Sequence, residues 1–117
     1  MAAHGELVAQ VAAAGPLVDH AVDALAAADT RGLGLTAEER GVVAVTVARA
    51  VVVAGRSALE ATGRAAEVAG PRATAARHAL DRYWRDARAI TLRAGTTAAA
   101  RIVGEHALAG TPPPHDD

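Results

Sequence analysis

The sequence of 117 residues contains no cysteine. This absence excludes disulfide frameworks, thiolate metal sites and cysteine nucleophiles, and it gives no sign of secretion. Lysine, asparagine and phenylalanine are missing as well. A chain of this length is one domain and can bury roughly two thirds of its unfolded surface, so it can build a hydrophobic core without disulfides.

Long uninterrupted hydrophobic runs are also missing. The longest, residues 41–55, is broken by Arg49 and is shorter than the roughly 20 residues that a membrane span needs. The first ten residues lack the basic segment that precedes the apolar core of a secretory signal. We therefore expect a soluble, cytoplasmic protein with no membrane partner.

Aromatic residues make up only 2% of the chain, and the formal net charge is -1. A nucleic-acid partner is not expected, because the charge is near zero and no aromatic residues are interleaved along a basic surface. The charge is unevenly distributed: residues 1–39 carry six acidic residues and one arginine, whereas residues 72–93 carry six arginines and two aspartates. Two interpretations stay open. In the first, the acidic and basic segments face each other or the solvent. In the second, the arginines of residues 72–93 line a site for an anionic ligand.

Alanine, by contrast, is abundant, and it has the highest helix propensity and lets helix backbones approach closely. The composition predicts an all-α fold, an antiparallel helical bundle of about four helices over residues 1–110, followed by a Pro-rich tail at 111–117. Hydrophobic periodicity places the helices at 6–28, 37–69, 74–92 and 98–108. Gly15-Pro16 is expected to kink the first helix or divide it into two.

The second helix has the strongest start signal. Thr36 and Glu39 are spaced as a capping box, in which each side chain accepts a hydrogen bond from the other residue's amide. The valine-rich stretch that follows would also suit a strand, but its charged and apolar residues separate on two faces at helical spacing. The charged stripe is Glu38, Arg49, Arg56, Glu60, Arg64 and Glu67, and the opposite side is Val43, Val47, Val51, Ala54, Ala58, Ala61, Ala65 and Val68.

Several further local features are expected. Gly70-Pro71 should end the second helix, and Thr96 or Thr97 should cap the last one. Ion pairs at i,i+4 spacing are expected for Arg56/Glu60, Glu60/Arg64, Asp81/Arg85 and Arg82/Asp86.

No catalytic constellation is visible in the sequence. The five histidines have no i,i+3 or i,i+4 pair, so no metal site is expected. Ser57, the only serine, has no histidine at helical spacing and gives no support for a hydrolytic triad.

The turn at Arg93, Gly95, Thr96 and Thr97 is the one candidate binding site. Gly95 allows close backbone approach, two hydroxyls follow it, and the amides of a helix N-terminus point outward. These features suit a phosphate or flavin contact. They are equally those of a plain capped helix start, and both interpretations stay open.

The same region resembles the C-terminal part of the acyl-CoA dehydrogenase superfamily. The similarity rests on residues 84–88 (Trp-Arg-Asp-Ala-Arg), 94–97 (Ala-Gly-Thr-Thr) and 100–104 (Ala-Arg-Ile-Val-Gly). A second set of short sequences looks more like the branch of flavin-dependent, dibenzothiophene-type monooxygenases. They are residues 36–40, 67–70, 82–85 and 108–113. The resemblance implies a four-helix bundle and a flavin, FAD or FMN, bound between domains and across subunits of an oligomer.

At three positions this sequence lacks the residue that the family often carries, so the resemblance implies no catalytic residue there. Ala94 stands where the dehydrogenases often carry the glutamate that removes a substrate proton, and a methyl group cannot act as a base. Ile90 and Arg93 stand where the monooxygenase branch tends to carry two histidines. No catalytic residue is therefore assigned, and the implied cofactor contacts are Arg93, Gly95, Thr96 and Thr97.

The leading expectation is a C-terminal helical subunit or fragment of a flavin-dependent dehydrogenase-like or monooxygenase-like oxidoreductase. It would supply an oligomerisation surface and part of a flavin site that another chain completes, so its partners would be further copies of itself, a dehydrogenase-like flavoprotein chain, or both. The alternative is a degenerate, non-catalytic helical scaffold. We do not expect the chain to catalyse a reaction alone.

Overall fold

The computed structural model describes residues 1–65 and 77–110. These residues form α1 (Ala2–Arg31), a short 3-10 turn η1 (Gly32–Gly34), α2 (Ala37–Gly63), α4 (Arg77–Arg93) and α5 (Thr96–Ala109), and the described part contains no strand. The expected all-α fold is confirmed. The predicted helix end at Gly70-Pro71 and the predicted tail lie outside the described residues.

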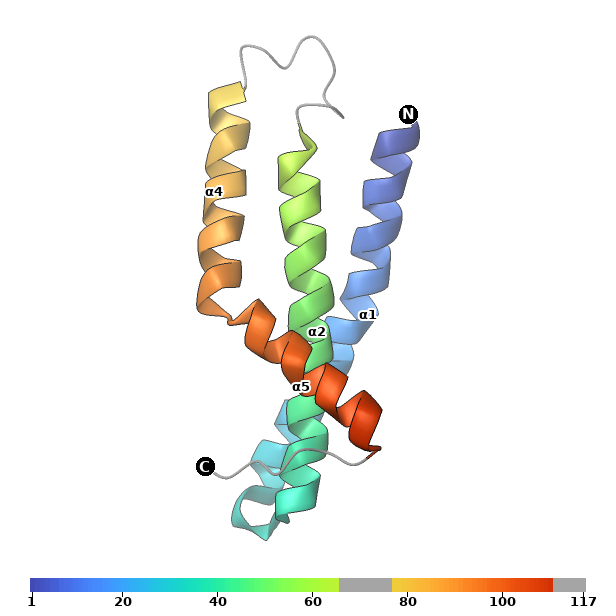
Figure 1. Cartoon of the computed structure of the whole chain (residues 1–117), viewed down its shortest axis with the longest axis vertical. Helices are drawn as coiled ribbons and strands as arrows, with labels where there is room; N and C mark the ends of the chain where they lie inside the picture. The colour runs from blue at the N-terminus through green and yellow to red at the C-terminus, as the bar shows by residue number, and fades with distance from the viewer. Residues whose placement is uncertain (66–76, 111–117) are drawn as a thin grey trace.

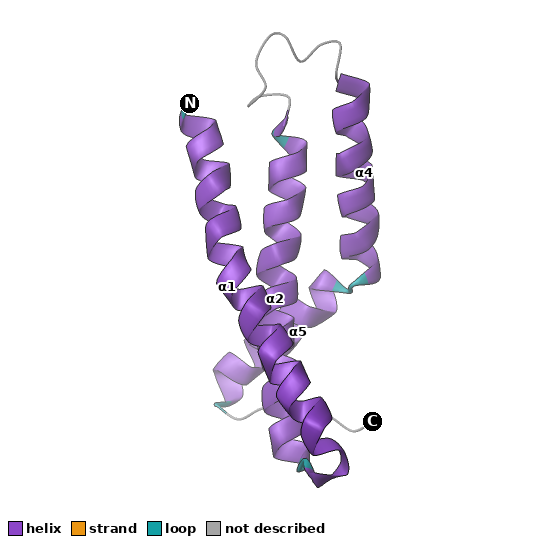
Figure 2. Ribbon diagram, turned by 180° about the vertical axis from the view of Figure 1, so that it is seen from behind, coloured by secondary structure: helices purple, strands orange, loops and turns teal. Residues whose placement is uncertain are grey.

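The helix α2 is the element on which the others pack. Helices α1, α4 and α5 each contact α2. Those three helices make few contacts with one another. In Figure 1, α1 and α4 run antiparallel to α2, and α5 crosses its lower half obliquely. Figure 2, seen from behind, places α1 on the opposite side of α2 from α5. The result is an elongated molecule of 55 × 25 × 24 Å with one central helix.

Helix α1 is continuous and is not divided at Gly15-Pro16. Pro16 lies inside it, and the helix extends beyond the predicted 6–28 at both ends, from Ala2 to Arg31. One proline removes a single backbone donor and bends a helix without ending it when packing holds both halves. That packing comes from Leu7, Ala14 and Ala21, which are buried at seven-residue spacing.

Helix α2 begins with the predicted capping box. The Thr36 hydroxyl accepts from the Glu39 amide at 3.1 Å, and the Glu39 carboxylate accepts from the Thr36 amide at 2.8 Å. The helix runs to Gly63, and the predicted end at Ala69 lies outside the described residues. Trp84 of α4 packs on this end, because a Cβ built on Gly63 would lie 3.5 Å from its Cδ1 atom.

The buried side of α2 differs from the predicted apolar face. Its buried residues are Gly41, Val45, Ala48 and Ala50, while Val47 of the predicted face is only half-buried. Periodicity identifies which residues are apolar, but this half of α2 is apolar on nearly all sides, so the position of α5 decides which side is covered.

The N-cap of the last helix differs from the predicted one, which was Thr96 or Thr97. Helix α5 begins at Thr96, two residues before the predicted start, and its N-cap is Gly95 with no side-chain capping bond. Thr96 is already the first residue of the helix and so does not occupy the N-cap position. Its hydroxyl donates to the carbonyl oxygen of Thr91 at 3.1 Å.

Of the four predicted ion pairs, one is present among the described residues. Arg64 pairs with Glu60 at 3.3 Å, and it also reaches Glu6 of α1 at 3.0 Å. The predicted pairs Arg56/Glu60, Asp81/Arg85 and Arg82/Asp86 are not formed within the described part of the chain. Glu60 accepts from Gln10 at 3.0 Å, so its carboxylate is already occupied.

A large part of the apolar surface is uncovered. The stretches Ala2–Gly34 and Ala37–Gly63 are long and apolar enough to cross a membrane, judged on length and composition alone. A core helix of a soluble protein meets the same test, so this property is weak evidence for a membrane. The large exposed apolar side chains of α1 are Val8, Val11, Val18, Val22 and Leu25.

Candidate functional site

The turn between α4 and α5 lies against α2 at Gly55. Its backbone is held by the Ala94 amide, which donates to the Ile90 carbonyl at 2.9 Å, and by the Gly95 amide, which donates to the Leu92 carbonyl at 3.3 Å. Gly95 has φ 68° and ψ 50°, in the left-handed region. A residue with a Cβ would be strained there by about 1–2 kcal/mol, so glycine is required for the chain direction to change.

Two threonine hydroxyls stabilise the turn by donating hydrogen bonds to backbone carbonyl oxygens. Thr91, which is buried, donates to the Arg88 carbonyl at 3.0 Å, and its own carbonyl accepts from the Thr96 hydroxyl. The last turn of α4 is thereby joined to the first residue of α5. Each hydrogen bond contributes about 1 kcal/mol, and together they restrict both side chains to one rotamer.

The turn lies close against α2 because of Gly55. A Cβ built on Gly55 would lie 3.3 Å from Thr91 Cγ2 and 3.4 Å from Thr96 Oγ1. The first distance is tighter than ordinary van der Waals contact and the second is at its lower limit, so a side chain at this position would require Thr91 to shift slightly. Gly55 therefore sets the depth at which the α4–α5 turn sits on α2.

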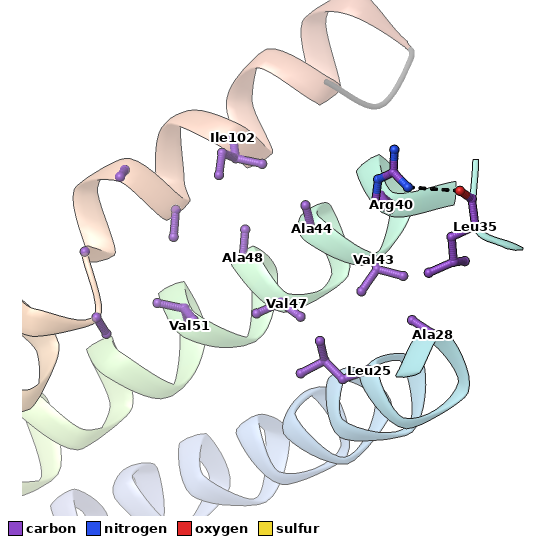
Figure 3. Close-up of a pocket in the computed structure, with 14 residues that line it drawn as sticks. Leu25, Ala28, Leu35, Arg40, Val43, Ala44, Val47, Ala48, Val51 and Ile102 are labelled. Carbon is purple, nitrogen blue, oxygen red and sulfur yellow. Dashed lines mark hydrogen bonds between the residues drawn. The ribbon is translucent and has the colours of Figure 1, made fainter. Parts of the chain in front are cut away.

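Three open cavities meet at this turn. The first, which we call the valine cavity, has a volume of about 420 Å³ and lies between α1, α2 and α5. Figure 3 shows Leu25, Val47 and Ile102 directed into it from these three helices. Its walls are almost wholly apolar, and its one charged residue, Arg40, donates to the Leu35 carbonyl at 2.9 Å.

The second, the tyrosine cavity, has a volume of about 470 Å³ and lies between α2 and α4. It is lined by Tyr83, Asp86 and Ile90 of α4, together with small residues of α2 and both threonines of the turn. Ala94 lines both this cavity and the valine cavity. The position expected for a proton-removing glutamate therefore opens on apolar space but carries a methyl group, which cannot transfer a proton.

The third, the arginine cavity, has a volume of about 510 Å³ and lies over the start of α5. Three arginines from three different helices line this cavity: Arg56 of α2, Arg88 of α4 and Arg101 of α5. The rest of its lining is Thr91, Thr96, Thr97 and Gly95, together with the apolar residues Leu59, Leu92 and Ala98.

The structure brings three of the four predicted cofactor-binding residues together. Gly95, Thr96 and Thr97 all line the arginine cavity. Arg93 does not line it or either of the other two cavities; its side chain is exposed. The sequence had suggested an arginine-lined site in general terms, but it did not single out Arg56 or Arg101.

The donor set of the arginine cavity fits the phosphate end of a flavin. Guanidinium groups, hydroxyls and the first amides of a helix are the groups that bind phosphate oxygens. The apolar cavities on the other side of the turn offer walls of the kind that a flat ring system contacts. Within residues 1–65 and 77–110, no cluster of three or more His, Cys, Asp or Glu is placed to hold a metal ion.

Comparison with known proteins identifies relatives for nearly the whole chain. Residues 1–107 match the family model described as "Acyl-CoA dehydrogenase, C-terminal domain". A dibenzothiophene monooxygenase of Mycolicibacterium goodii is 34% identical over 105 residues, which is 90% of this chain and 25% of that protein. A probable FMNH2-dependent monooxygenase of Pseudomonas putida, SfnC, is 39% identical over 79% of this chain and 23% of its own length.

A third relative, a dibenzothiophene monooxygenase of Rhodococcus erythropolis, is 35% identical over 71% of this chain and 20% of its own length. The chain thus spans about a quarter of the length of the curated relatives that it matches. The family model covers both α1 and the α4–α5 turn that borders all three cavities. The resemblance first seen in the turn and its flanking helices therefore extends over the whole bundle, and the chain belongs to the acyl-CoA dehydrogenase family as its C-terminal domain.

Proposed function

We propose that this chain is the C-terminal helical part of a flavin-dependent monooxygenase, either a separate subunit or a fragment of a longer chain. Two observations support the proposal: the family match over residues 1–107, and relatives whose names describe dibenzothiophene and FMNH2-dependent monooxygenases. The first of these carries most weight, because it covers nearly all of the chain. Since the relatives are about four times longer, the complete reaction belongs to a larger assembly.

The first proposed role is to supply an association surface. The exposed stripe on α1, Val8, Val11, Val18, Val22 and Leu25, continues into the valine cavity through Leu25. Exposed apolar surface of this extent is typical of faces that another protein covers. We assign it to contacts with the flavoprotein part of the assembly or with further copies of the chain.

The second proposed role is to form one wall of a flavin site, for FMN or FAD, that another chain completes. When bound, the flavin supplies the redox chemistry. This chain would hold it through Gly95, Thr96 and Thr97, which line the arginine cavity. Arg93 is exposed beside the turn and lines none of the three cavities, so it would act only through its charge. Ala94 moves no proton, so the chain positions the cofactor and leaves acid–base steps to other residues.

Co-expression tests this proposal. The tagged chain is produced together with acyl-CoA dehydrogenase-like chains from the same genome that lack a C-terminal bundle, and the purified complex is assayed for bound flavin and for monooxygenase activity. We expect co-purification with stoichiometric flavin. If no such chain co-purifies, the separate-subunit form of the proposal is wrong.

A double variant separates the flavin role from a purely structural scaffold. Thr97→Ala combined with Arg93→Ala should reduce the flavin content of the complex while the complex itself still forms, because the Thr97 hydroxyl makes no hydrogen bond within the described residues. Arg49→Ala is the matched control, because Arg49 is an exposed arginine that belongs to α2 and not to the α4–α5 turn. Unchanged flavin content in the double variant would favour the scaffold.

A further inference from the structure

Helix α1 carries two apolar stripes, and the described part of the fold covers only one of them. The first, Leu7, Ala14 and Ala21, is buried on the side that packs against α2. The second begins one residue later, which is about 100° further round the helix axis. We call it the outer stripe, and its residues are Val8, Val11, Gly15, Val18, Val22 and Leu25.

The outer stripe has the form of a seam for another helix. Its five large side chains are between 38% and 56% exposed, and none of its six positions is charged. Successive positions are three and four residues apart in alternation, which is the spacing by which one α-helix packs lengthwise on another. In Figure 2 the lower half of α1 lies in front of α2, and no described helix covers its outer side.

The spacing of the outer stripe is the same when it is read from either end. From Val8 to Leu25 the steps are three, four, three, four and three residues. When a second copy of α1 lies antiparallel to the first, Val8 of one copy is therefore opposite Leu25 of the other. Val11 is opposite Val22 in the same way. A two-fold contact needs such a self-complementary surface, whereas a helix of an unrelated protein does not demand it.

Gly15 lies at the centre of this arrangement, opposite Val18 of the second copy. A Cβ built on Gly15 would meet nothing within 4 Å, so no described side chain of its own copy fills the space beside it. A glycine at this position lets the two backbones approach closely where the helices cross. Val18 of the other copy would occupy the space.

The charges at the ends and edge of the stripe also match when the helices are antiparallel. The next seam positions beyond the ends are His4 and Asp29, which are exposed and whose side chains make no hydrogen bond or ion pair within the described residues. Each His4 then lies opposite an Asp29 carboxylate, to which its imidazole can donate. At the edge, Asp19 faces Ala12 of the other copy. A parallel pair would instead place Asp29 beside Asp29, which like charge disfavours.

We propose that the outer stripe joins two copies of the chain through an antiparallel, two-fold pairing of their α1 helices. The occupant is a second copy because the spacing, the central glycine and the end charges each match the stripe with itself. The inference deepens the proposed association role, and it rests on that role for the need of a partner. It involves neither the flavin nor the α4–α5 turn.

Sedimentation velocity of the full chain alone, at increasing concentration, tests the pairing. We expect a reversible equilibrium between monomer and dimer. Val11→Glu combined with Val22→Glu sets carboxylates opposite each other and should weaken the dimer by about a hundredfold or more. Ile90→Glu combined with Leu108→Glu is the matched control, because it changes two exposed apolar residues outside α1 and should leave the dimer unchanged. Circular dichroism checks that each variant is folded.

Cross-linking determines the orientation, since the natural chain has no cysteine. Val8→Cys combined with Leu25→Cys should give a covalent dimer on oxidation. The two positions lie about 26 Å apart along one helix, too far for a disulfide within one copy. Val8→Cys alone should stay uncross-linked in an antiparallel pair, whereas a parallel pair would place the two Val8 positions side by side.

Each result decides for or against the pairing. A dimer that is weakened by Val11→Glu with Val22→Glu, and that cross-links only in the double cysteine variant, supports it. A monomer at every concentration, an unchanged dimer in the α1 variant, or cross-linking by Val8→Cys alone would overturn it. So would dissociation by Ile90→Glu with Leu108→Glu, which would show that α4 or α5 forms the contact. No flavoprotein chain is present in these measurements, so co-expression still tests the proposed function separately.

Discussion

The hydroxyl of Thr96 donates to the carbonyl oxygen of Thr91 across the α4–α5 turn at 3.1 Å. The bond joins the first residue of α5 to the last turn of α4, so the direction of α5 is fixed relative to the helix before it. Because the same turn borders all three cavities, this one contact positions the walls of the whole candidate site.

Replacing Thr96 with valine should therefore destabilise the bundle. Thr96→Val keeps the side-chain shape, removes the donor and leaves a carbonyl of the buried Thr91 without this partner, at an expected loss of about 1 kcal/mol in the free energy of unfolding. Urea titration measures it. Thr97→Val is the matched control, because Thr97 is exposed and its hydroxyl makes no hydrogen bond within the described residues. Equal stability of the two variants would contradict the assigned role.

The two glycines Gly55 and Gly104 should respond differently to alanine. Both lie inside helices, where Gly→Ala favours the folded state by about 0.5–1 kcal/mol. A Cβ at Gly104 meets nothing within 4 Å, so Gly104→Ala should raise the melting temperature. At Gly55 the new Cβ would press on Thr91 and Thr96, whose rotamers are held by hydrogen bonds, and strain of about 1–3 kcal/mol should cancel or exceed the gain.

Thermal unfolding of the two alanine variants, compared with the unchanged chain, checks this difference. A further variant, Gly55→Val, enlarges the expected effect, because a branched side chain cannot be accommodated by small shifts of the turn. If Gly55→Ala stabilised the protein as much as Gly104→Ala, the close approach of the turn to α2 would be wrong.

Local signals in the sequence predicted the parts of the fold that depend on neighbours in the chain. The capping box at Thr36 and Glu39 is such a case, because both hydrogen bonds join residues three apart. The helical state of the valine-rich segment is another, since periodicity outweighed the β-branched composition. The sequence left open whether α1 continues through Pro16, because that depends on packing that the sequence does not display.

The candidate site was only partly predictable for the same reason. The glycine and threonines at 95–97 are adjacent in sequence and could be recognised as a helix start. The cap was assigned wrongly because the left-handed Gly95 takes the N-cap position, so Thr96 is already the first helical residue. Arg56 and Arg101 are far from each other in the chain, and only the crossing of α5 over α2 brings them to one cavity.

The start of α2 should be sensitive to acid through Glu39. A hydrogen bond from Arg31 at 2.8 Å, and secondly the Thr36 amide, hold the pKa of the Glu39 carboxyl below its usual value. A carboxyl with a lowered pKa in the folded state stabilises that state above its unfolded pKa of about 4.3, and the contribution disappears as the pH falls through the folded pKa. Stability should thus decline in the range below about pH 4.

Arg31→Gln removes the largest cause of this shift and should move the Glu39 titration upward toward the ordinary value. Carbon-detected NMR titration of the Glu39 carboxyl measures the change directly, and urea midpoints at neutral and acidic pH show whether stability follows. Because Glu39 is exposed, the effect should be smaller at high salt, where screening weakens surface pairs. Arg49→Gln, an equal change of charge away from Glu39, should leave the titration unaltered. An unshifted Glu39 titration in Arg31→Gln would show that the capping box, and not the arginine, sets the acid response of this helix start.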